Sequence, residues 1–582
     1  MCCIIKVVYI VMYTTLIFYI LRIGGFIMNI KIGIKIAETR IDKEYDTEIS
    51  LKEISLDFNT AYASPIVAAK VNNVIKDIQT VIHEDCEIEF IEMNTEFGIK
   101  VYQRSVTFLL IAAVHELYTK GEVTVEHSVS NGLFCEVHLG RVLLDADVKA
   151  IECKMREIVL EERTIMKKAL PKDECLELFK KSGQFEKANL IAHLERDTVS
   201  VYFCGKIYDY LYGPILSNTG EIHLFGLTHY KSGLIIRIPE IGNVDTVPKF
   251  VEQEKLANIF AEAEQWAEIL QCDYVEKLNT YTKRGHIDEI IRISEALHEK
   301  KIAQIADFIV NHTNQARIIL IAGPSSSGKT TFAQRLRVQL RVNGVIPVAI
   351  SLDDYFLNRA YTPRDEKGNY DFEALEALDI ELFNQQLIDL LNGKAVEIPY
   401  YNFLTGEREY RGNIVQISES QPIIIEGIHG LNERLTSKIP RDKKLKIYIS
   451  ALTQLAIDGH NRIPTTDARL IRRIVRDYKF RGSTALKTLK QWQSVRNGEE
   501  KNIFPFQEEA DIMFNSALIY ELGILKKHAE PLLKEVKNTE YEHAEATRLL
   551  NFLEYFISIE DDNEVPVNSI LKEFIGKSCF VK

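Results

Sequence analysis

Gly323-Pro-Ser-Ser-Ser-Gly328-Lys329-Thr330 is the stretch that decides how this chain folds and what chemistry it can carry. A continuous apolar run at 318–322 precedes it, with the length and composition of a strand buried on both faces. Residues 331–342, which follow it, read as a helix. The stretch fits the pattern G-x-x-x-x-G-K-[S/T], in which glycines let consecutive backbone N–H groups point at phosphate oxygens. The sequence therefore predicts a phosphate-binding loop between a buried strand and a helix.

Two side chains of this loop carry the chemistry expected of a nucleotide site. Lys329 places a point charge where the β- and γ-phosphates of a nucleotide would lie, and Thr330 offers a hydroxyl to Mg²⁺. The helix that follows adds the positive end of its dipole. A tight turn with a purely structural role would have no need of Lys329, so the loop indicates ATP and Mg²⁺ as cofactors.

The residues after the loop repeat a pattern of strand and helix. Mainly apolar runs at 346–351, 422–425 and 445–449 are separated by helical sequence. Such alternation is typical of a parallel sheet covered by helices. Ligands of open sheets of this kind bind at the carboxyl edge of the strands, where the phosphate loop also lies.

Acidic side chains lie at the ends of two of these predicted strands. Asp353 and Asp354 follow the run 346–351. A carboxylate here can accept the proton of an attacking hydroxyl during phosphoryl transfer, and we expect Asp353 to be this general base. Asp354 would then be a helix cap or a turn residue. Glu426 follows the run 422–425 and is expected to provide a second contact to Mg²⁺.

A cluster of five arginines occupies residues 469–481. Several of them are three or four residues apart, which brings them to one face of a helix. Guanidinium groups stabilise transferring phosphoryl oxygens, so we predict a lid over the phosphates. The residues predicted to be catalytic are Lys329, Asp353, Arg469 and Arg473. The residues predicted to bind the nucleotide are Gly323, Pro324, Ser325, Ser326, Ser327, Gly328, Lys329, Thr330, Thr331, Arg472 and Arg476.

The composition excludes several classes of protein. Of 582 residues, 46% are hydrophobic and 26% are charged, which is typical of globular chains and unlike disordered, collagenous or polytopic membrane proteins. The net charge of −12 argues against DNA binding and against strong affinity for other nucleic acids. Nine cysteines include no C-x-x-C pair, which favours reduced thiols and a cytoplasmic location over a zinc site.

The first 28 residues differ from the rest. An uncharged, mostly apolar run at 7–21 is shorter than the roughly 20 residues that a membrane span needs. We expect residues 1–28 to be an apolar N-terminal extension outside the fold, with the first strand beginning after Met28. An N-terminal anchor on a cytoplasmic body is the alternative, and no membrane partner is expected.

Taken in order, the motifs of residues 317–525 resemble those of the uridine kinase / phosphoribulokinase family of P-loop kinases. Besides the phosphate loop, these motifs lie at 351–356, 370–372, 399–403, 426–429, 467–482 and 510–516. The resemblance implies an ATP- and Mg²⁺-dependent nucleoside kinase. In it Asp353 would activate the 5′-hydroxyl, and Thr330 and Glu426 would hold Mg²⁺.

The resemblance also implies how the acceptor would be held. Asp371 and Arg469 would contact the ribose hydroxyls, and Tyr401 would lie against the base. Uridine kinases carry a histidine shortly after the matching tyrosine that helps to read the pyrimidine, and Gly406 stands in its place here. We therefore expect the phosphate chemistry to be preserved, whereas the identity of the acceptor is left open.

Motifs at 68–72, 209–214 and 218–222 carry a second resemblance. Through them the N-terminal half is similar to the front end of threonyl-tRNA synthetase. Residues 29–93 resemble its TGS domain, within which we expect strands at 30–36 and 87–91 and a short helix and turn in 64–81. Residues 94–240 resemble its second additional domain, which hydrolyses mischarged tRNA. Here we expect helices at 107–119 and 145–169.

The editing site of that family uses a His-x-x-x-His pair and a later cysteine and histidine. The matching stretches here, 104–108 and 209–215, contain none of these four residues. A metal site built from them is therefore excluded. We expect a retained scaffold with a binding or regulatory role.

These observations predict a multidomain α/β protein. Its C-terminal part would be a P-loop parallel α/β sheet, and its N-terminal parts would be α+β domains. The predicted divisions are 1–28, 29–93, 94–240, a helical connector at 241–315, the kinase-like domain at 316–530 and a helical tail at 531–582. The expected function is transfer of the γ-phosphoryl group of ATP to a nucleoside 5′-hydroxyl.

Two alternatives stay open. One is a kinase of another small hydroxyl metabolite. The other is a regulator associated with tRNA or the ribosome, whose P-loop acts as a nucleotide switch and whose N-terminal half makes weak tRNA contact. Asp353 discriminates between the two classes, because a switch needs no base for an acceptor hydroxyl. Assembly into a homo-oligomer is also left open.

Overall fold

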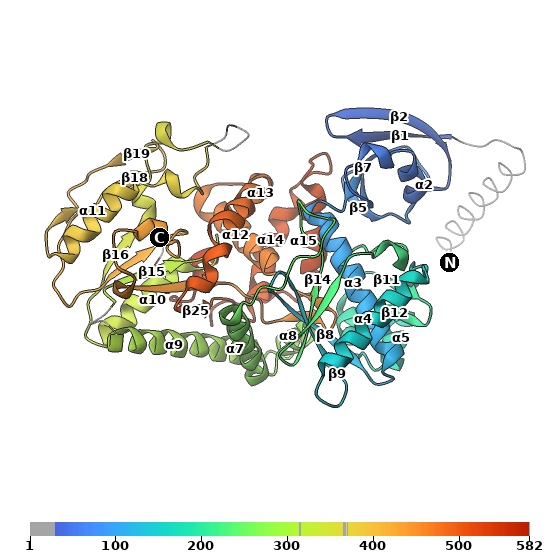
Figure 1. The fold of residues 1–582 in the computed structure, drawn as a ribbon, viewed down its shortest axis with the longest axis horizontal. Helices are drawn as coiled ribbons and strands as arrows, with labels where there is room; N and C mark the ends of the chain where they lie inside the picture. The colour runs from blue at the N-terminus through green and yellow to red at the C-terminus, as the bar shows by residue number, and fades with distance from the viewer. Residues whose placement is uncertain (1–28, 313–315, 365–367, 369, 581–582) are drawn as a thin grey trace, which may run out of the picture.

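The computed structural model describes residues 29–312, 316–364, 368 and 370–580 (Figure 1). The predictions for residues 1–28 lie outside the described part of the chain. The predicted multidomain α/β fold is confirmed, with a parallel sheet in the C-terminal region and separate sheets in the N-terminal half. The positions of the domain divisions stay a prediction.

The first sheet is formed by residues 29–92 and has the strand order β2-β1-β7-β4-β5. Its alternating residues Ile30, Ile32 and Ile34 are buried, as the pattern predicts. The predicted strands at 30–36 and 87–91 are confirmed. The bounds are β1 Asn29–Ile36, β2 Thr39–Asp46, β3 Ile49–Ser50, α2 Leu51–Leu56, β4 Ile66–Val71, β5 Val74–Asp77, β6 Val81–Ile82 and β7 Cys86–Glu92.

The helix expected within 64–81 is wrong, because this segment forms the hairpin β4–β5. Asn72 and Asn73 both take positive φ, at 49° and 59°. A two-residue turn of this conformation matches the twist of paired strands, and asparagine tolerates it. The sequence predicts the turn, whereas the two strands become evident only from their pairing, β4 with β7 and β5 with β4.

Residues 96–237 form the second unit around α3 (Glu96–Leu117), which is long and apolar enough to cross a membrane. Most of its apolar window is buried in this unit, so we interpret it as a core helix. The helix expected over 145–169 ends at Leu160, and a strand follows. The other bounds are β8 Glu122–Val129, β9 Gly132–His138, α4 Asp145–Leu160, β10 Met166–Pro171, α5 Lys172–Lys181, α6 Phe185–His193, β11 Thr198–Cys204, β12 Ile207–Asp209, β13 Gly226–Tyr230 and β14 Gly233–Arg237.

Three helices lead to the C-terminal sheet: α7 (Glu254–Leu270), α8 (Val275–Lys283) and α9 (Ile287–His312). The first ends at Gln271, whose φ of 49° is left-handed. The last packs along α10, and Glu299 in it accepts a 2.6 Å bond from Arg335. The connector is therefore part of the packed C-terminal body (Figure 1).

The C-terminal sheet is parallel, with the order β16-β21-β15-β22-β25. Every residue of the central strand β15 is buried, as its continuous apolar run predicts. The strands predicted at 318–322, 346–351, 422–425 and 445–449 are confirmed within two residues. The bounds are β15 Ile318–Ala322, α10 Lys329–Val342, β16 Val348–Ser351, β21 Ile423–Glu426, β22 Lys444–Ser450 and β25 Ile512–Asn515.

Helices and hairpins attached to this sheet complete the C-terminal half. Their bounds are α11 Ile380–Leu391, β17 Val396–Glu397, β18 Tyr400–Asn402, β19 Glu407–Glu409, β20 Ile414–Val415, β23 Ala456–Asp458, β24 Asn461–Arg462, α12 Thr465–Arg481, α13 Ala485–Asn502, α14 Glu521–Lys534, α15 His543–Leu553 and α16 Lys572–Ile575. The C-terminal region is helical only in part, since residues 556–571 contain no helix.

A buried ionic network joins the two halves of the chain. Lys187 on α6 forms an ion pair with Asp209 and lies 3.7 Å from Asp458 in the C-terminal half. His460 Nδ1 lies 2.7 Å from Asp209 Oδ2. Burial disfavours ionisation of Asp209, but His460 and Lys187 outweigh it and lower the pKa of Asp209 to about 2.

This network predicts that Lys187→Met destabilises the protein by about 3–5 kcal/mol, because Asp209 would remain buried after losing one of its two cationic partners. The free energy of urea unfolding measures the change, with the exposed Lys181→Met as the control. The depressed pKa of Asp209 gives stability that is present above its unfolded pKa of about 4. That stability is lost as the pH falls toward 2. If Lys187→Met lowers the free energy of unfolding by less than about 1 kcal/mol, the network does not stabilise the protein as described.

Candidate functional site

The phosphate loop lies between β15 and α10, where the sequence predicts it. A Cβ atom on Gly323 would meet the carbonyl oxygen of Ile449 at 2.0 Å, so only glycine allows this approach. Gly328 and Ser326 take left-handed φ values of 82° and 58°. The loop therefore needs glycine at both ends to curl over the end of the sheet.

Lys329 lies folded against its own loop. Its Nζ donates to the carbonyl oxygens of Gly323 at 2.9 Å and of Pro324 at 3.1 Å. Burial lowers the pKa of Lys329, while the carboxylates around it, Glu426 first, act in the opposite direction. A cation in this position is available to phosphate groups that reach the loop.

Thr330 and Glu426 are brought together from α10 and the end of β21. Thr330 Oγ1 donates to Glu426 Oε1 at 3.3 Å, so the two side chains can reach the same ion. Burial raises the pKa of Glu426 to about 7, although Lys329 opposes this shift. A buried carboxylate beside a hydroxyl fits Mg²⁺, which prefers few protein ligands together with water and phosphate oxygens. In the described part of the chain, no group of three or more His, Cys, Asp or Glu side chains could hold a metal.

The structure gives different surroundings to the two neighbouring aspartates after β16. The Asp354 carboxylate accepts the backbone N–H of Tyr401 at 3.4 Å and so anchors the hairpin β18–β19. Asp353 is exposed and lies close enough to Lys329 for that charge to act on its carboxyl group. The surrounding protein raises the pKa of Asp353, and Lys329 and Arg481 oppose the shift. Of the two carboxylates, Asp353 is therefore the one placed to meet a substrate.

The predicted arginine lid is wrong for Arg469 and Arg472, which are among the most buried side chains of the protein. Arg469 is paired with Glu499 on α13, and its Nη2 lies 2.7 Å from Glu499 Oε2. Arg472 is paired with Glu521 on α14. The two arginines also donate to the carbonyl oxygens of Ser325 and Ser326, at 3.1 and 3.3 Å. They support the phosphate loop from below.

The remaining arginines of the cluster gather around Asp477. Arg473 Nη1 donates to Ser325 Oγ at 2.7 Å, so this residue alone reaches a side chain of the phosphate loop. Arg476 Nη2 lies 2.8 Å from Asp477 Oδ1. Arg481 is mostly exposed and lies 3.6 Å from the same carboxylate. The sequence shows the arginine cluster. It does not show that Arg469 and Arg472 form ion pairs, because their glutamate partners lie 30 and 49 residues further along the chain.

The residues expected to hold the acceptor are only partly arranged for that role. Asp371 Oδ1 accepts the backbone N–H of Glu373 at 3.1 Å. Tyr401 is buried among Phe356 and Phe403, so its ring does not face an open cavity. Arg469 is paired with Glu499, so its guanidinium is engaged in a buried ion pair and not open to ribose hydroxyls.

At Gly406, which stands where uridine kinases carry a histidine, the structure leaves no space for a side chain. This glycine has a φ of 75°, and a Cβ atom on it would meet the guanidinium of Arg359 at 2.7 Å. Arg359 Nη2 donates to the carbonyl oxygen of Phe403 at 2.8 Å. Arg359 therefore fills the space that a side chain at 406 would need.

Sequence reasoning missed three glutamates of the site. The carboxylate of Glu499 accepts the backbone N–H of Ser325 at 2.9 Å, and Glu573 accepts that of Thr331 at 3.1 Å. Burial raises the pKa of Glu373 to about 7, with Arg473 acting in the opposite direction. No local pattern marks these residues, because Glu499 and Glu573 reach the loop from distant parts of the chain and Glu373 is buried by the tertiary structure.

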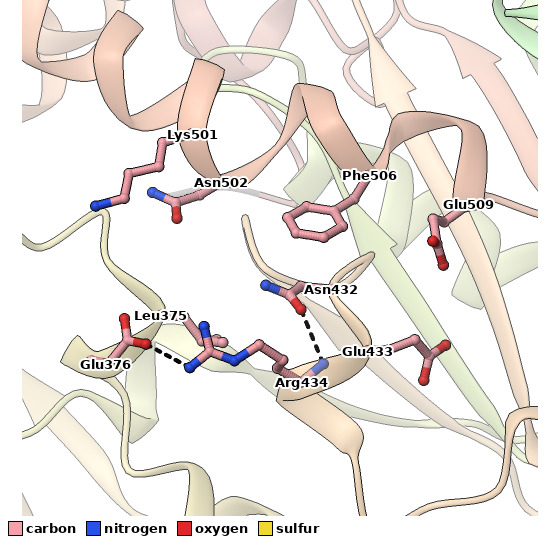
Figure 2. Close-up of a pocket in the computed structure, with 9 residues that line it drawn as sticks. All are labelled: Leu375, Glu376, Asn432, Glu433, Arg434, Lys501, Asn502, Phe506 and Glu509. Atoms are coloured by element: carbon pink, nitrogen blue, oxygen red, sulfur yellow. Dashed lines mark hydrogen bonds and ion pairs between the residues drawn. The ribbon is translucent and has the colours of Figure 1, made fainter. Parts of the chain in front are cut away.

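Two cavities lie beside this site. Figure 2 shows one of about 460 Å³ between the segment of Arg434 and the helix that carries Lys501. In it Arg434 forms a 2.7 Å ion pair with Glu376, and none of the predicted site residues lines it. The other, of about 1280 Å³, lies between the N-terminal and C-terminal halves and includes Arg469 in its wall.

Comparison with known proteins agrees with both resemblances. Residues 318–519 match the family described as Phosphoribulokinase / Uridine kinase family. The N-terminal half is similar to threonine–tRNA ligases. That of Janthinobacterium sp. (strain Marseille) is 31% identical over 186 residues, or 32% of this chain and 29% of the relative. That of Francisella tularensis subsp. novicida (strain U112) is 28% identical over 244 residues, or 42% of this chain and 36% of the relative.

The chain spans only about three tenths of the length of the first of these curated relatives. Among solved structures, a proposed uridine kinase from Bacillus stearothermophilus is 22% identical, with 36% of this chain and 97% of that chain covered and a TM-score of 0.24. A proposed fructose transport system kinase from Silicibacter sp. TM1040 is 17% identical, with 37% and 98% covered and a TM-score of 0.27.

The buried pairing of Arg469 predicts a structural phenotype. Arg469→Met should lower the free energy of unfolding by about 3–5 kcal/mol, because Glu499 would lose its main counter-charge. Urea denaturation measures this loss, and Arg481→Met, at the exposed end of α12, should change stability by less than about 1 kcal/mol. Unchanged stability of Arg469→Met together with lost activity would restore the lid interpretation.

Proposed function

We propose that this protein is an ATP- and Mg²⁺-dependent kinase that transfers the γ-phosphoryl group of ATP to the 5′-hydroxyl of a nucleoside. The family match at 318–519 supports a P-loop kinase. The observation that carries the proposal is the convergence of Lys329, Asp353 and the Thr330–Glu426 pair at the carboxyl edge of the parallel sheet. A cytoplasmic location, where ATP is available, is part of the proposal.

Each of these residues has a definite task in such a reaction. Lys329 would leave its own loop carbonyls and bind the β- and γ-phosphates. Thr330 and Glu426 would hold Mg²⁺, which supplies positive charge to the phosphoryl oxygens when bound. Asp353 would accept the proton of the acceptor hydroxyl. The surrounding protein raises its pKa, which strengthens Asp353 as a base.

The surroundings of Gly406 bear on the identity of the acceptor. Arg359 occupies the space beside Gly406, and its Nη2 donates to a backbone carbonyl oxygen instead of a carboxylate. An unpaired guanidinium suits a carbonyl or anionic group on the acceptor. A small hydroxyl metabolite other than a nucleoside is therefore the second candidate, and a panel of nucleosides, sugars and polyols separates the two.

A regulator associated with tRNA or the ribosome is a proposal of another class. The similarity of the N-terminal half to threonine–tRNA ligases favours it. Filter binding to bulk tRNA over a range of salt concentrations tests it, since phosphate contacts make affinity fall with salt.

Asp353→Asn provides the decisive test of the kinase. We expect phosphoryl transfer to fall by about 10²–10⁴-fold, because the acceptor hydroxyl loses its general base. Calorimetry should show that ATP binding is retained, and the matched Asp354→Asn should affect transfer much less. Failure of the wild-type protein to phosphorylate any member of the acceptor panel, or undiminished transfer by Asp353→Asn, would refute the proposal.

A further inference from the structure

A carboxylate from the C-terminal end of the chain occupies the phosphate loop. Glu573 accepts hydrogen bonds from both Thr331 Oγ1, at 2.7 Å, and the backbone N–H of Thr331, at 3.1 Å. This N–H belongs to the first turn of α10, where backbone donors have no partner within the helix and anions bind. Thr331 directly follows the motif and is among the residues that the sequence predicts to bind the nucleotide.

The chain around Glu573 is packed directly over the loop. A Cβ atom on Gly328 would lie 2.5 Å from Cγ2 of Ile570, so the side chain of Ile570 packs directly against the backbone of the loop. The ring of Phe574 lies beneath the guanidinium of Arg472, at 5.0 Å. Lys479 Nζ donates to the carbonyl oxygen of Ile575 at 2.6 Å. This segment therefore covers Gly328 and Thr331, which the sequence predicts to bind the nucleotide.

We propose that residues 569–576, the C-terminal strap, are an intrinsic competitor of ATP, with the Glu573 carboxylate standing where a nucleotide phosphate would bind. The proposal rests on the proposed function only in taking the loop as an ATP site. ATP binds once the strap has moved away, so the apparent affinity for ATP is reduced by the fraction of molecules in which the strap is closed. A partner that held the strap aside would activate the enzyme.

The strap is held by few polar contacts besides Glu573. Its only helix, α16, has four residues. Ser569 Oγ donates to Glu295 at 2.5 Å, and Lys572 Nζ lies 3.3 Å from Asp562. Ile570, Leu571 and Phe574 are buried, so removing the whole segment would expose the core. A single change at Glu573 is the cleaner perturbation.

The test uses the full chain with Glu573→Gln, which keeps the shape of the side chain but removes its charge. Hydrogen bonds to a charged group are about twice as strong as neutral ones, so we expect ATP·Mg²⁺ to bind about tenfold more tightly by calorimetry. Glu560→Gln, an exposed change in the same region, is the control and should bind as the wild type does. Hydrogen exchange at 569–576 in the wild type should accelerate when ATP is added.

The outcomes separate this proposal from the kinase proposal. The proposal that the strap competes with ATP is overturned if Glu573→Gln binds ATP as the wild type does or more weakly. It is also overturned if ATP slows hydrogen exchange in the strap. ATP binding that tightens as expected, without phosphorylation of any acceptor, supports the strap and refutes the kinase. Absence of ATP binding in the wild type and in both variants overturns both.

A second inference concerns the 1280 Å³ cavity between the two halves. Eight lysines and arginines line it, and among the described residues seven of them lie within 4.0 Å of a carboxylate. The eighth is Arg104 on α3. Its Nε donates to the carbonyl oxygen of Pro214 at 3.0 Å, while its Nη2 is buried without a hydrogen-bond partner.

The guanidinium of Arg104 lies against the backbone of Gly213, where a Cβ atom would meet its Cζ at 2.9 Å. Burial lowers the pKa of Arg104 to about 10, which leaves it charged at neutral pH. A buried charge without a counter-charge is costly. We infer that Arg104 anchors the carboxylate or phosphate group of a small metabolite in this cavity, at a site that both halves of the chain line.

The Lys329→Met background removes the cation of the phosphate loop, so that the remaining response to anions can be measured. Inorganic phosphate or acetate should raise the melting temperature of this variant, and the stronger of the two identifies the preferred group. The response should vanish in Lys329→Met/Arg104→Met. Without added anion, the Arg104→Met change should leave the melting temperature the same or higher. An anion response that persists in the double variant, or a lower melting temperature without anion, overturns the inference.

Discussion

The backbone N–H groups of the phosphate loop and of the first turn of α10 are donors that need partners, and much of the C-terminal half is arranged around them. In this structure two carboxylates from distant segments meet that need. Glu499 on α13 accepts the N–H of Ser325, and Glu573 in the strap accepts that of Thr331. The loop that would bind nucleotide phosphates thereby also fixes where α13 and the strap lie.

The same constraint explains the arginines of α12. Glu499 brings a buried negative charge to the loop, and Arg469 neutralises it while also bonding the carbonyl oxygen of Ser325. Arg472 does the same with Glu521 and Ser326. A buried charge is tolerated when it is paired and hydrogen-bonded, and these pairs satisfy that condition on both sides. Basic residues that look like a lid in the sequence are thus supports of the loop.

The N-terminal half is bound to this arrangement by contacts of the same kind. Asp209 lies between Lys187 of its own half and His460 of the other, and Tyr212 donates its hydroxyl to the carbonyl oxygen of Arg548 on α15 at 2.6 Å. The two halves therefore share buried charges, and the cavity that contains Arg104 lies between them. A ligand there would contact both the synthetase-like scaffold and the region that carries the phosphate loop.

The sequence by itself determined the features that depend on neighbours along the chain. The apolar run at 318–322, the glycines of the loop, and Asp353 and Glu426 at strand ends all lie where their local patterns predict. The tertiary structure alone decided the partners: Thr331 meets Glu573 across 242 residues, Arg469 meets Glu499 across 30, and β4 becomes a strand beside β7. Periodicity and motif spacing report which face of an element is apolar and which backbone turns are allowed. They carry no information on which charged residues from distant parts of the chain will be buried next to each other. That pairing decides whether the arginines of α12 support the phosphate loop or cover it as a lid, and whether the loop is open or occupied by a carboxylate.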